Sequence, residues 1–404
     1  MNVMEIEDKY GIQFCDRQLL VIEKGRGSFI WDEKDARYLY FTSGWGVTCL
    51  GHAHPVITKA LHKQAKKLIQ NSNSGFTYSP ARAKLLNQLR QLLPGNLNRM
   101  FFVNSGAEAN DAAIKLARKV SGKTRIISTK ESFHGRTFNT QSVSGGKVYT
   151  DRYIPTLPDT HFVNFGDISE FKKAINDDTA AVIIEPVQGE GGVRIPSMDY
   201  LQQIGRVCKK HSALLIVDEI QTGFGRTGRF FALEHGDGKI EPDILTMGKG
   251  IAGGFPFAGF AVTERLAGKL GKGDHGGTYC GNPLGCAVAT AVIKYLQENN
   301  IARRALVCGD YLLRGLRMLA RQYPRLIIEA RGIGLLTALE LADDGLVQHF
   351  SDACQQQGLL VTLTRNGIVR LIPDLFVVLT HIDKALGIMH SSLASMESQL
   401  AAAS

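Results

Sequence analysis

One lysine of the chain stands between two glycines, directly after a short apolar run. The run is DILTM (243–247), and Gly248, Lys249 and Gly250 follow it. Small neighbours and apolar surroundings can strip water from the amine, which lowers the pKa of a lysine and makes it available for Schiff-base chemistry. Taken alone, a lysine is more often a solvated surface residue. A phosphate loop of the form GxxxxGK does not fit, because Gly250 stands where Ser or Thr is required.

Acidic residues follow two further apolar runs. ALLIV (213–217) leads into Asp218, and AAVII (180–184) leads into Glu185 and a glycine-rich loop. An unpaired carboxylate at the rim of a dry site is costly, so Asp218 needs a cationic or hydrogen-bonding partner. Either acid could instead be a cap or part of a structural ion pair. The glycines after Glu185 let the backbone approach a ligand closely.

A turn of small residues follows the apolar run MFFV (100–103) and precedes a helical pattern. Its residues Ser105, Gly106 and Ala107 free backbone N–H groups that can meet a phosphate, with the helix dipole assisting. The alternative is a simple helix N-cap by Ser105.

The elements that must position these residues alternate between helices and short apolar strands. Each strand is four or five residues long and flanked by helix-like or Gly-rich segments, as in strands buried on both faces. This pattern predicts an α/β domain with a largely parallel sheet, whose ligands bind at the carboxyl ends of the strands. The predicted strands are MFFV, RIIS (125–128), AAVII, ALLIV, DILTM and GFAV (259–262).

The two ends of the chain have a different pattern. The first 50 residues are β-rich, and a compact α+β end follows a long amphipathic stretch (285–322). We therefore expect an N-terminal segment (1–50), a large domain (51–310) and a C-terminal small domain (311–404). The segments behind this expectation are GSFIWD (27–32), ARYLYF (36–41), EARGIGLLTALEL (329–341), GLLVTL (358–363), IVRLIP (368–373) and a final helix (382–399).

Composition excludes several classes of protein. The 404 residues are 44% hydrophobic, and 47 Lys and Arg against 38 Asp and Glu leave a charge of +9. The basic residues are scattered, so nucleic acid is not the expected partner, although the charge can steer anionic ligands. No membrane span or secretion signal is expected. The seven cysteines form no CxxC pair, which argues against disulfides and a metal site and favours a cytoplasmic location.

An acid that can pair with a pyridine nitrogen, a phosphate turn and a desolvated amine together describe pyridoxal 5′-phosphate chemistry. Six motifs in order resemble the class III, fold-type I aminotransferases, with the acetylornithine/ornithine subgroup closest. The resemblance extends from 27–32 to 369–375 and implies a large domain with a mostly parallel sheet, plus a small α+β domain from both terminal segments. The motifs are NSGAEAN (104–110), FHGRT (133–137), EPVQGEGG (185–192), DEIQTGFGRTG (218–228), MGKGIAGGFP (247–256) and GGTYCGNPLG (276–285).

The resemblance implies roles around the cofactor ring. Lys249 resembles the lysine that carries the cofactor as a Schiff base and then moves the substrate proton. Asp218 would pair with the pyridine nitrogen, and Gln221 would bond near the 3′ oxygen. Phe133 would stack on the ring, although such a residue is more often a core aromatic.

The resemblance also implies a phosphate site that two subunits share. Ser105, Gly106 and Ala107 would form the phosphate cradle. Thr278 is similar to a family threonine that reaches the phosphate from the neighbouring subunit. A homodimer with active sites at its interface is therefore implied.

Two arginines match family positions that bind carboxylates. They are Arg136 and Arg370, and an arginine fork can hold a carboxylate through two parallel hydrogen bonds. Without the motifs, either could be a surface ion pair. Glu190 resembles the glutamate that masks the second arginine when an ω-amino donor binds and releases it for 2-oxoglutarate.

The expected activity is transfer of an amino group from N-acetylornithine, ornithine or a similar ω-amino donor to 2-oxoglutarate, giving a semialdehyde and glutamate. Gly277 and Trp45 depart from the subgroup pattern on the substrate side, where Ser and a smaller residue are common. Other class III activities therefore stay open: transamination of GABA or diamines, amino mutase, decarboxylase or racemase chemistry. A non-enzymatic binding protein is the remaining alternative.

Overall fold

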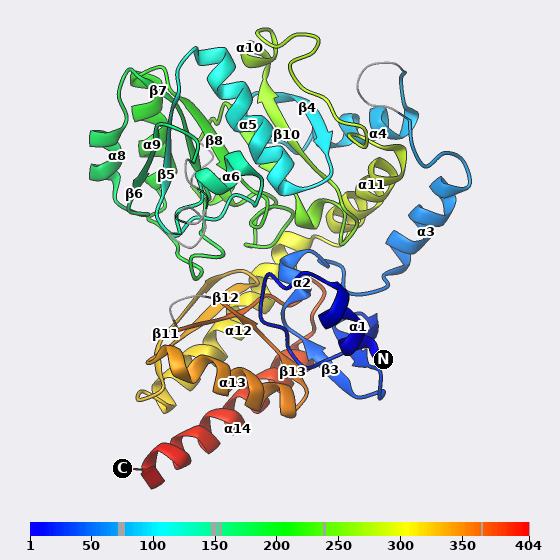
Figure 1. Ribbon diagram of the computed structural model, residues 1–404, viewed down its shortest axis with the longest axis vertical. Helices are drawn as coiled ribbons and strands as arrows, with labels where there is room; N and C mark the ends of the chain where they lie inside the picture. The colour runs from blue at the N-terminus through cyan, green and yellow to red at the C-terminus, as the bar shows by residue number, and fades with distance from the viewer. Residues whose placement is uncertain are drawn as a thin grey trace.

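The computed structural model describes residues 1–71, 77–146, 151, 153, 156–236, 240–364 and 367–403. A seven-stranded sheet with its helices occupies one half of the molecule, and two four-stranded sheets occupy the other (Figure 1). A 22-residue helix, α12 (Ile301–Gln322), leads from the first half into the second.

The seven-stranded sheet has the order β4-β10-β9-β8-β7-β5-β6. The neighbours from β6 to β9 pair in parallel, whereas β10 is antiparallel to both β9 and β4. All strands described for this sheet except β10 therefore end at one edge, which confirms the predicted, largely parallel α/β sheet. The strands are β4 (Leu97–Val103), β5 (Arg125–Thr129), β6 (Thr160–Val163), β7 (Thr179–Ile184), β8 (Leu214–Asp218), β9 (Ile244–Met247) and β10 (Ala258–Thr263).

Alternating side chains of the central strands pack against helices on both faces of the sheet. In β7, Ala181 and Ile183 join one core cluster with the alanines of α5, whereas Val182 and Ile184 join a second cluster with Phe171 of α8. Burial on both faces explains why these strands are continuous apolar runs. The helices of this half are α3 (Pro55–Ala65), α4 (Pro80–Leu89), α5 (Gly106–Ser121), α6 (Phe138–Ser142), α8 (Ile168–Ala174), α9 (Tyr200–Lys210), α10 (Glu264–Ala267) and α11 (Pro283–Glu298).

Segments from both ends of the chain build the other half. In the sheet β1-β2-β3-β13, Leu39 of β3 pairs in parallel with Leu359 of β13, although 320 positions separate them. The second sheet has the order β11-β12-β15-β14. The strands are β1 (Ile22–Arg26), β2 (Phe29–Asp32), β3 (Arg37–Tyr40), β11 (Ile327–Ile333), β12 (Leu336–Leu341), β13 (Leu359–Leu360), β14 (Thr362–Leu363) and β15 (Ile368–Leu371).

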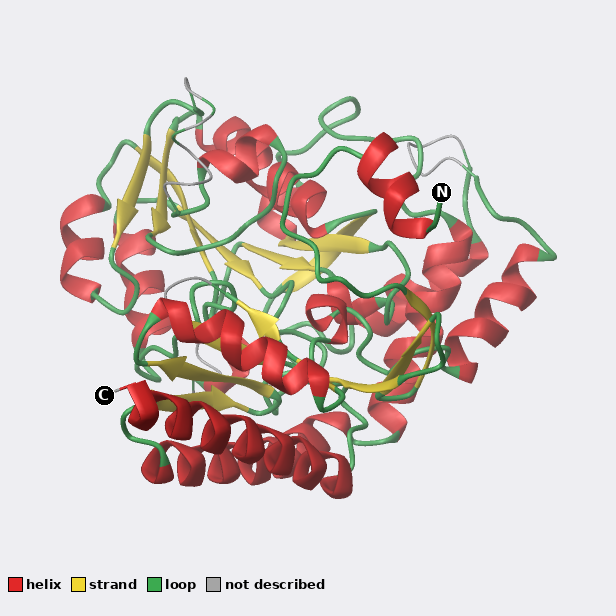
Figure 2. Ribbon diagram, turned by 60° about the horizontal axis from the view of Figure 1, so that its bottom comes forward, coloured by secondary structure: helices red, strands yellow, loops and turns green. Residues whose placement is uncertain are grey.

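Long helices cover this second half (Figure 2). The terminal helix α14 (Leu379–Ala403) contacts both α12 and α13 (Asp344–Gln356). It is longer than the predicted final helix. The amphipathic stretch 285–322 forms two helices, α11 and α12, because the chain turns at Asn300 with a left-handed φ of 46°.

Some short elements differ from the sequence-based expectation. The β-rich N-terminal segment also contains α1 (Val3–Tyr10), whose N-terminus has a capping box formed by Asn2 and Glu5. A further short helix, α2 (Ser43–Gly46), lies between β3 and α3, and β6 was not predicted. Two 3-10 helices, η1 (Ala232–His235) and η2 (Lys249–Ile251), complete the described elements.

All seven cysteines lie in the described ranges and are free thiols, six of them buried. Among the described helices, none is both long and apolar enough to cross a membrane. Within the same ranges, His, Cys, Asp and Glu side chains do not gather in a group of three or more that could hold a metal ion.

Candidate active site

The common edge of the seven-stranded sheet collects the residues that the sequence singled out. Asp218 is the last residue of β8, Glu185 directly follows β7, and Ser105 lies two positions after β4. Lys249 follows β9 after one glycine and begins η2. Because these strands run in the same direction, residues scattered over 145 positions meet at one edge.

Lys249 has the properties of a reactive amine. Its backbone adopts a left-handed φ of 44°, a conformation that costs energy for a residue other than glycine and often marks functional sites. Burial of the amine, together with the charge of Arg370, lowers its pKa to about 8, although the carboxylates of Glu190, Asp218 and Glu185 oppose the shift. The unprotonated, reactive form of the amine is therefore far more populated near neutral pH than it is in a solvated lysine.

Two glycines allow the lysine loop, the helix turn and the Asp218 segment to pack together. A Cβ on Gly106 would lie 2.8 Å from Cδ1 of Ile220, and a Cβ on Gly248 would lie 3.0 Å from Cγ2 of the same side chain. A Cβ on Gly248 would also lie 3.6 Å from Cα of Gly106. A Cβ at either position would therefore force the Ile220 side chain to shift, and neither glycine has a positive φ.

Asp218 is 3% exposed and accepts three hydrogen bonds. Its Oδ2 accepts from Nδ2 of Asn110 and from Nδ1 of His134, both at 2.7 Å, and its Oδ1 accepts from the Ile220 amide at 3.0 Å. A carboxylate oxygen only accepts, so Nδ1 is the ring nitrogen of His134 that carries the proton. This confirms that Asp218 needs hydrogen-bonding partners.

Sequence reasoning missed the roles of Asn110, His134 and Thr246. Asn110 and His134 lie within the quoted motifs, but their contacts with Asp218 depend on the packing of three separate segments. Thr246 donates its hydroxyl to Oδ1 of Asn110 at 2.7 Å. The available signal was a polar residue in an otherwise apolar strand: Thr246 is the hydroxyl-bearing residue of DILTM and is fully buried.

Ser105 caps the N-terminus of α5, as the structural alternative predicted. Its hydroxyl accepts from the Glu108 amide at 3.2 Å, and the Glu108 carboxylate accepts from the Ser105 amide at 3.3 Å. Capping uses the oxygen as an acceptor and leaves the hydroxyl proton free to be donated. The amides of Gly106 and Ala107 belong to the first helical turn, where the helix itself offers no carbonyl partner. Capping and phosphate binding are therefore compatible.

Arg370 on β15 is fully buried and faces the same edge from the second half of the molecule. Its Nη1 lies 2.7 Å from Oε1 of Glu190 and 3.5 Å from Oε1 of Gln221. Among the described residues, its Nε and Nη2 have no hydrogen-bond partner. A Cβ at position 189 would overlap Oε1 of Gln221, so glycine at this position lets the Gln221 side chain keep its place beside Arg370.

The other predicted site residues are more exposed. Arg136 is exposed, with Cζ 5.9 Å from the ring centroid of Phe133, whose own amide donates to Glu185. Thr278 is exposed on a loop, and its carbonyl accepts from the side chain of Gln70. Trp45 is 63% exposed, and its carbonyl accepts from Nε2 of Gln221 at 3.5 Å.

Two buried carboxylates flank the site. Burial raises the pKa of Glu185 to about 7, although the His134 ring and the amides of Gly189 and Phe133 favour its charged form. Burial likewise raises the pKa of Glu219 to about 7, against hydrogen bonds from Thr222 and the Leu233 amide. Glu185 joins the Phe133 loop to the glycine-rich loop after β7, which is a positioning role.

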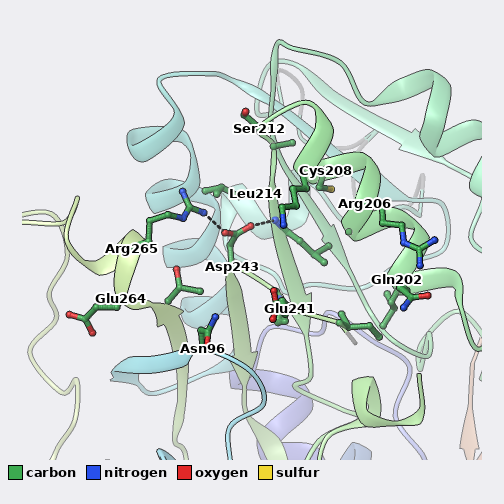
Figure 3. Close-up of a pocket in the computed structure, with 18 of the residues that line it drawn as sticks. Asn96, Gln202, Arg206, Cys208, Ser212, Leu214, Glu241, Asp243, Glu264 and Arg265 are labelled. Atoms are coloured by element: carbon green, nitrogen blue, oxygen red, sulfur yellow. Dashed lines mark hydrogen bonds and ion pairs between the residues drawn. The ribbon is translucent and has the colours of Figure 1, made fainter. Parts of the chain in front are cut away.

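A hollow of about 810 Å³ lies at the opposite edge of the sheet, where β8 and β9 begin (Figure 3). Its central acid, Asp243, accepts from Arg265 at 2.6 Å and from the Leu215 amide at 3.0 Å. None of the predicted site residues lines it. The ion pair with Arg265 and the hydrogen bond from the Leu215 amide give Asp243 a structural role. The edge at which β7, β8 and β9 end therefore remains the candidate active site.

Known proteins are similar to nearly the whole length of the chain. A family profile described as aminotransferase class-III covers residues 14–393. Acetylornithine aminotransferase of Methanothermobacter thermautotrophicus is 39% identical over 388 residues, which is 96% of this chain and 97% of that protein. The acetylornithine aminotransferase of Vibrio parahaemolyticus is 40% identical over 381 residues, 92% of this chain and 93% of that protein.

Solved structures show the same fold. Ornithine aminotransferase of Toxoplasma gondii superposes with a TM-score of 0.93 at 30% identity, covering 98% of this chain and 95% of that one. Acetylornithine aminotransferase of Elizabethkingia anophelis superposes with a TM-score of 0.85 at 30% identity, covering 97% and 98%. A second structure of the Toxoplasma enzyme is described with pyridoxal phosphate at its active site. These similarities confirm the predicted fold-type I architecture.

Proposed function

The chain belongs to the class III aminotransferases, which depend on pyridoxal 5′-phosphate, and from this premise we propose that it moves an amino group from an ω-amino donor to 2-oxoglutarate. The donor is N-acetylornithine, ornithine or a compound of the same class, and the products are the semialdehyde and glutamate. The observation that carries this proposal is the buried Lys249 amine at the edge where Asp218 and the N-terminus of α5 meet.

The side chains at this edge fit the cofactor. Lys249 offers an amine with a lowered pKa to the aldehyde, and Asp218 offers a carboxylate to the ring nitrogen. For the phosphate there is the first turn of α5, with the Ser105 hydroxyl and the amides of Gly106 and Ala107. The three groups complement the three polar ends of the cofactor.

When bound, the cofactor supplies an electron-withdrawing ring that stabilises negative charge on the substrate carbon. The chain's own contribution is to hold and move a proton. With its pKa near 8, Nζ of Lys249 could accept the proton from the carbon that bears the amino group and could donate it to the aldehyde-derived carbon of the cofactor. Three hydrogen bonds fix the Asp218 carboxylate in the position where it would meet the ring nitrogen.

Arg370 is the proposed carboxylate receptor, because two of its nitrogens are buried without a partner among the described residues. Glu190 covers the third nitrogen from a partly exposed position. An ω-amino donor leaves this ion pair intact. A dicarboxylate such as 2-oxoglutarate would displace Glu190 and bind the guanidinium through two parallel hydrogen bonds.

The remaining roles extend the proposal. Phe133 stacks on the cofactor ring, Gln221 bonds near the 3′ oxygen, and Arg136 binds a second substrate carboxylate. The position of Arg136 beside Phe133 supports this placement. Thr278 reaches the phosphate of a neighbouring subunit, and its exposure on a loop leaves it accessible to such a partner.

At the level of the assembly, we propose a cytoplasmic homodimer with shared active sites and no nucleic-acid or membrane partner. The free state of the seven cysteines is consistent with a reducing compartment. We also propose that residues 51–310 form a large cofactor-binding domain and that 1–50 and 311–404 together form the small domain. The pairing of β3 with β13 supports the joining of the two terminal segments.

The test is spectroscopic and chemical. The purified protein is expected to show a visible cofactor band that Lys249→Ala removes and that Lys210→Ala, at an exposed position on α9, retains. A panel of amino donors with 2-oxoglutarate is then assayed for glutamate. Formation of glutamate from an ω-amino donor supports the proposal. No glutamate from any donor would favour mutase, decarboxylase or racemase chemistry instead.

A further inference from the structure

We infer that Asn110 is a positioning residue that aims the Asp218 carboxylate, and that the Thr246 hydroxyl sets the orientation of the Asn110 amide. The inference deepens the proposed function and rests on it, because Asp218 has a ring nitrogen to meet only in a pyridoxal phosphate enzyme. Neither side chain needs to touch the substrate to perform this role.

Asn110 lies on the face of α5 that packs against the sheet, among alanines. The side chain is completely buried, and Ala109, Ala112 and Ala113 of the same helix are buried as well. A buried amide is costly unless its polar atoms are bonded. Here Nδ2 donates to the His134 carbonyl at 2.9 Å and to Oδ2 of Asp218 at 2.7 Å, while Oδ1 accepts from Thr246.

This set of partners permits one amide orientation. Nδ2 faces a carbonyl and a carboxylate, which are both acceptors, and Oδ1 faces a hydroxyl that can donate. The reversed amide would place Oδ1 against the Asp218 carboxylate, and the two oxygens would repel each other. The Thr246 hydroxyl therefore keeps a donor directed at Asp218.

The hydrogen bonds on Asp218 determine which of its oxygens stays available. Oδ2 accepts from Asn110 and from His134, so both of its acceptor positions in the carboxylate plane are used. Oδ1 accepts from the Ile220 amide and keeps one further acceptor position. Two donors on one oxygen also resist rotation of the carboxylate, so Oδ1 is held ready for the ring N–H.

Thr246 also connects this carboxylate to the strand that carries the lysine. It pairs with Asp218 in the register of β8 and β9, and it lies three positions before Lys249. Its carbonyl accepts from the Glu219 amide at 3.0 Å, so backbone and side chain both tie β9 to the acidic strand end. One residue thus couples the position of the Asp218 carboxylate to that of the lysine loop.

The decisive experiment compares Thr246→Val, which has nearly the same shape without the hydroxyl, with Thr246→Ser, which keeps it. The dissociation constant of pyridoxal 5′-phosphate is measured by titrating cofactor-free protein, together with the circular dichroism of the cofactor band and kcat and KM. Thr246→Val is expected to weaken cofactor binding roughly 5- to 50-fold, to change the dichroic band and to lower kcat with little change in KM. Thr246→Ser should stay within about twofold of the parent.

Thr290→Val is the matched control. Thr290 is also a buried threonine, and its hydroxyl donates to the Cys286 carbonyl within α11 at 2.8 Å. This variant should lose stability without changing the cofactor band. Asn110→Ala provides a second variant, and its cofactor binding should fall at least as far as that of Thr246→Val.

The inference is overturned if Thr246→Val and Asn110→Ala both keep the parental dissociation constant and dichroic band. It is also overturned if Thr246→Ser loses as much as Thr246→Val, because packing rather than the hydroxyl would then be responsible. Failure of the proposed function is separate: the parent protein itself would form no glutamate, or Lys249→Ala would retain the cofactor band.

Discussion

Nη1 of Arg370 lies 2.7 Å from Oε1 of Glu190, and the two side chains differ sharply in exposure. The arginine is completely buried, whereas 29% of the glutamate side chain is exposed. A buried cation is costly without a partner, and the partly exposed glutamate can turn towards solvent when another carboxylate arrives. The pair therefore has the properties of a displaceable cover over a carboxylate receptor.

Replacing Glu190 with Gln should shift preference towards dicarboxylate substrates. Without the charge of Glu190, glutamate and 2-oxoglutarate no longer compete with a carboxylate for Arg370. The ratio of kcat/KM for glutamate to that for the ω-amino donor should therefore rise about tenfold or more. Stopped-flow measurement of the two half-reactions gives this ratio. Glu264→Gln is the control, because Glu264 pairs with Arg99 and lines the hollow at the opposite edge of the sheet. An unchanged ratio in Glu190→Gln would contradict the masking role.

The lowered pKa of Lys249 predicts the pH dependence of cofactor attachment. The unprotonated amine reacts, so the attachment rate should rise with pH and level off above a pKa of about 8 rather than near 10.5. Rates of reconstitution of cofactor-free protein between pH 6 and 10 measure it. A rate still climbing steeply at about pH 10 would mean that the amine is solvated.

The same shift has a consequence for stability. Between pH 8 and 10.5 the folded protein has released a proton that the unfolded chain still binds. By linkage, the contribution of Lys249 to the free energy of unfolding of the cofactor-free protein rises with pH across this window. Lys249→Met should remove this contribution. Urea unfolding at pH 7.5 and 10 gives the free energy of unfolding of both proteins, and the difference between parent and variant should be smaller at pH 10.

Glu185 should show the opposite dependence at lower pH. Its pKa is raised from 4.5 to about 7, so the folded protein binds more protons than the unfolded chain in this range, and stability is lost as pH rises through it. Glu185→Gln is neutral, but its one oxygen can accept from only one of the amides of Phe133 and Gly189, which bond to different oxygens of Glu185. That loss is the same at every pH, so the free energy of unfolding of the variant relative to the parent should still be higher at pH 8 than at pH 5, by up to about 3 kcal/mol. Thermal unfolding of the cofactor-free forms at both values tests this, and an equal difference at both would refute it.

Gly189→Ala should damage the site without unfolding the protein. Its Cβ would overlap Oε1 of Gln221, so that side chain must move away from Arg370 and Trp45. We expect a loss of activity of about tenfold or more with a near-parental far-ultraviolet spectrum. Gly387→Ala in α14 is the control: nothing lies within 4 Å of its Cβ, and it should raise stability by about 0.5–1 kcal/mol. Full activity in Gly189→Ala would show that the position of Gln221 is unimportant.

The continuous apolar strands were predictable because burial on both faces leaves a strong sequence signal. AAVII and ALLIV correspond to β7 and β8, and their ends correctly locate Glu185 and Asp218. The short strand β6 and the break at Asn300 were not predicted. THFV has few apolar residues, and a single left-handed asparagine within an amphipathic stretch leaves little trace in the pattern of hydrophobic residues.

The sequence by itself determined the class of chemistry: a lysine between glycines, an acid after an apolar strand and a small-residue turn before a helix, in an order shared with one family. Tertiary structure alone decided which groups act on one another. Asn110, His134 and Thr246 converge around Asp218, and Glu190 covers Arg370. Local sequence reports what each segment prefers, whereas these contacts arise where strands far apart in the chain end at one edge of a sheet, and only folding brings those ends together.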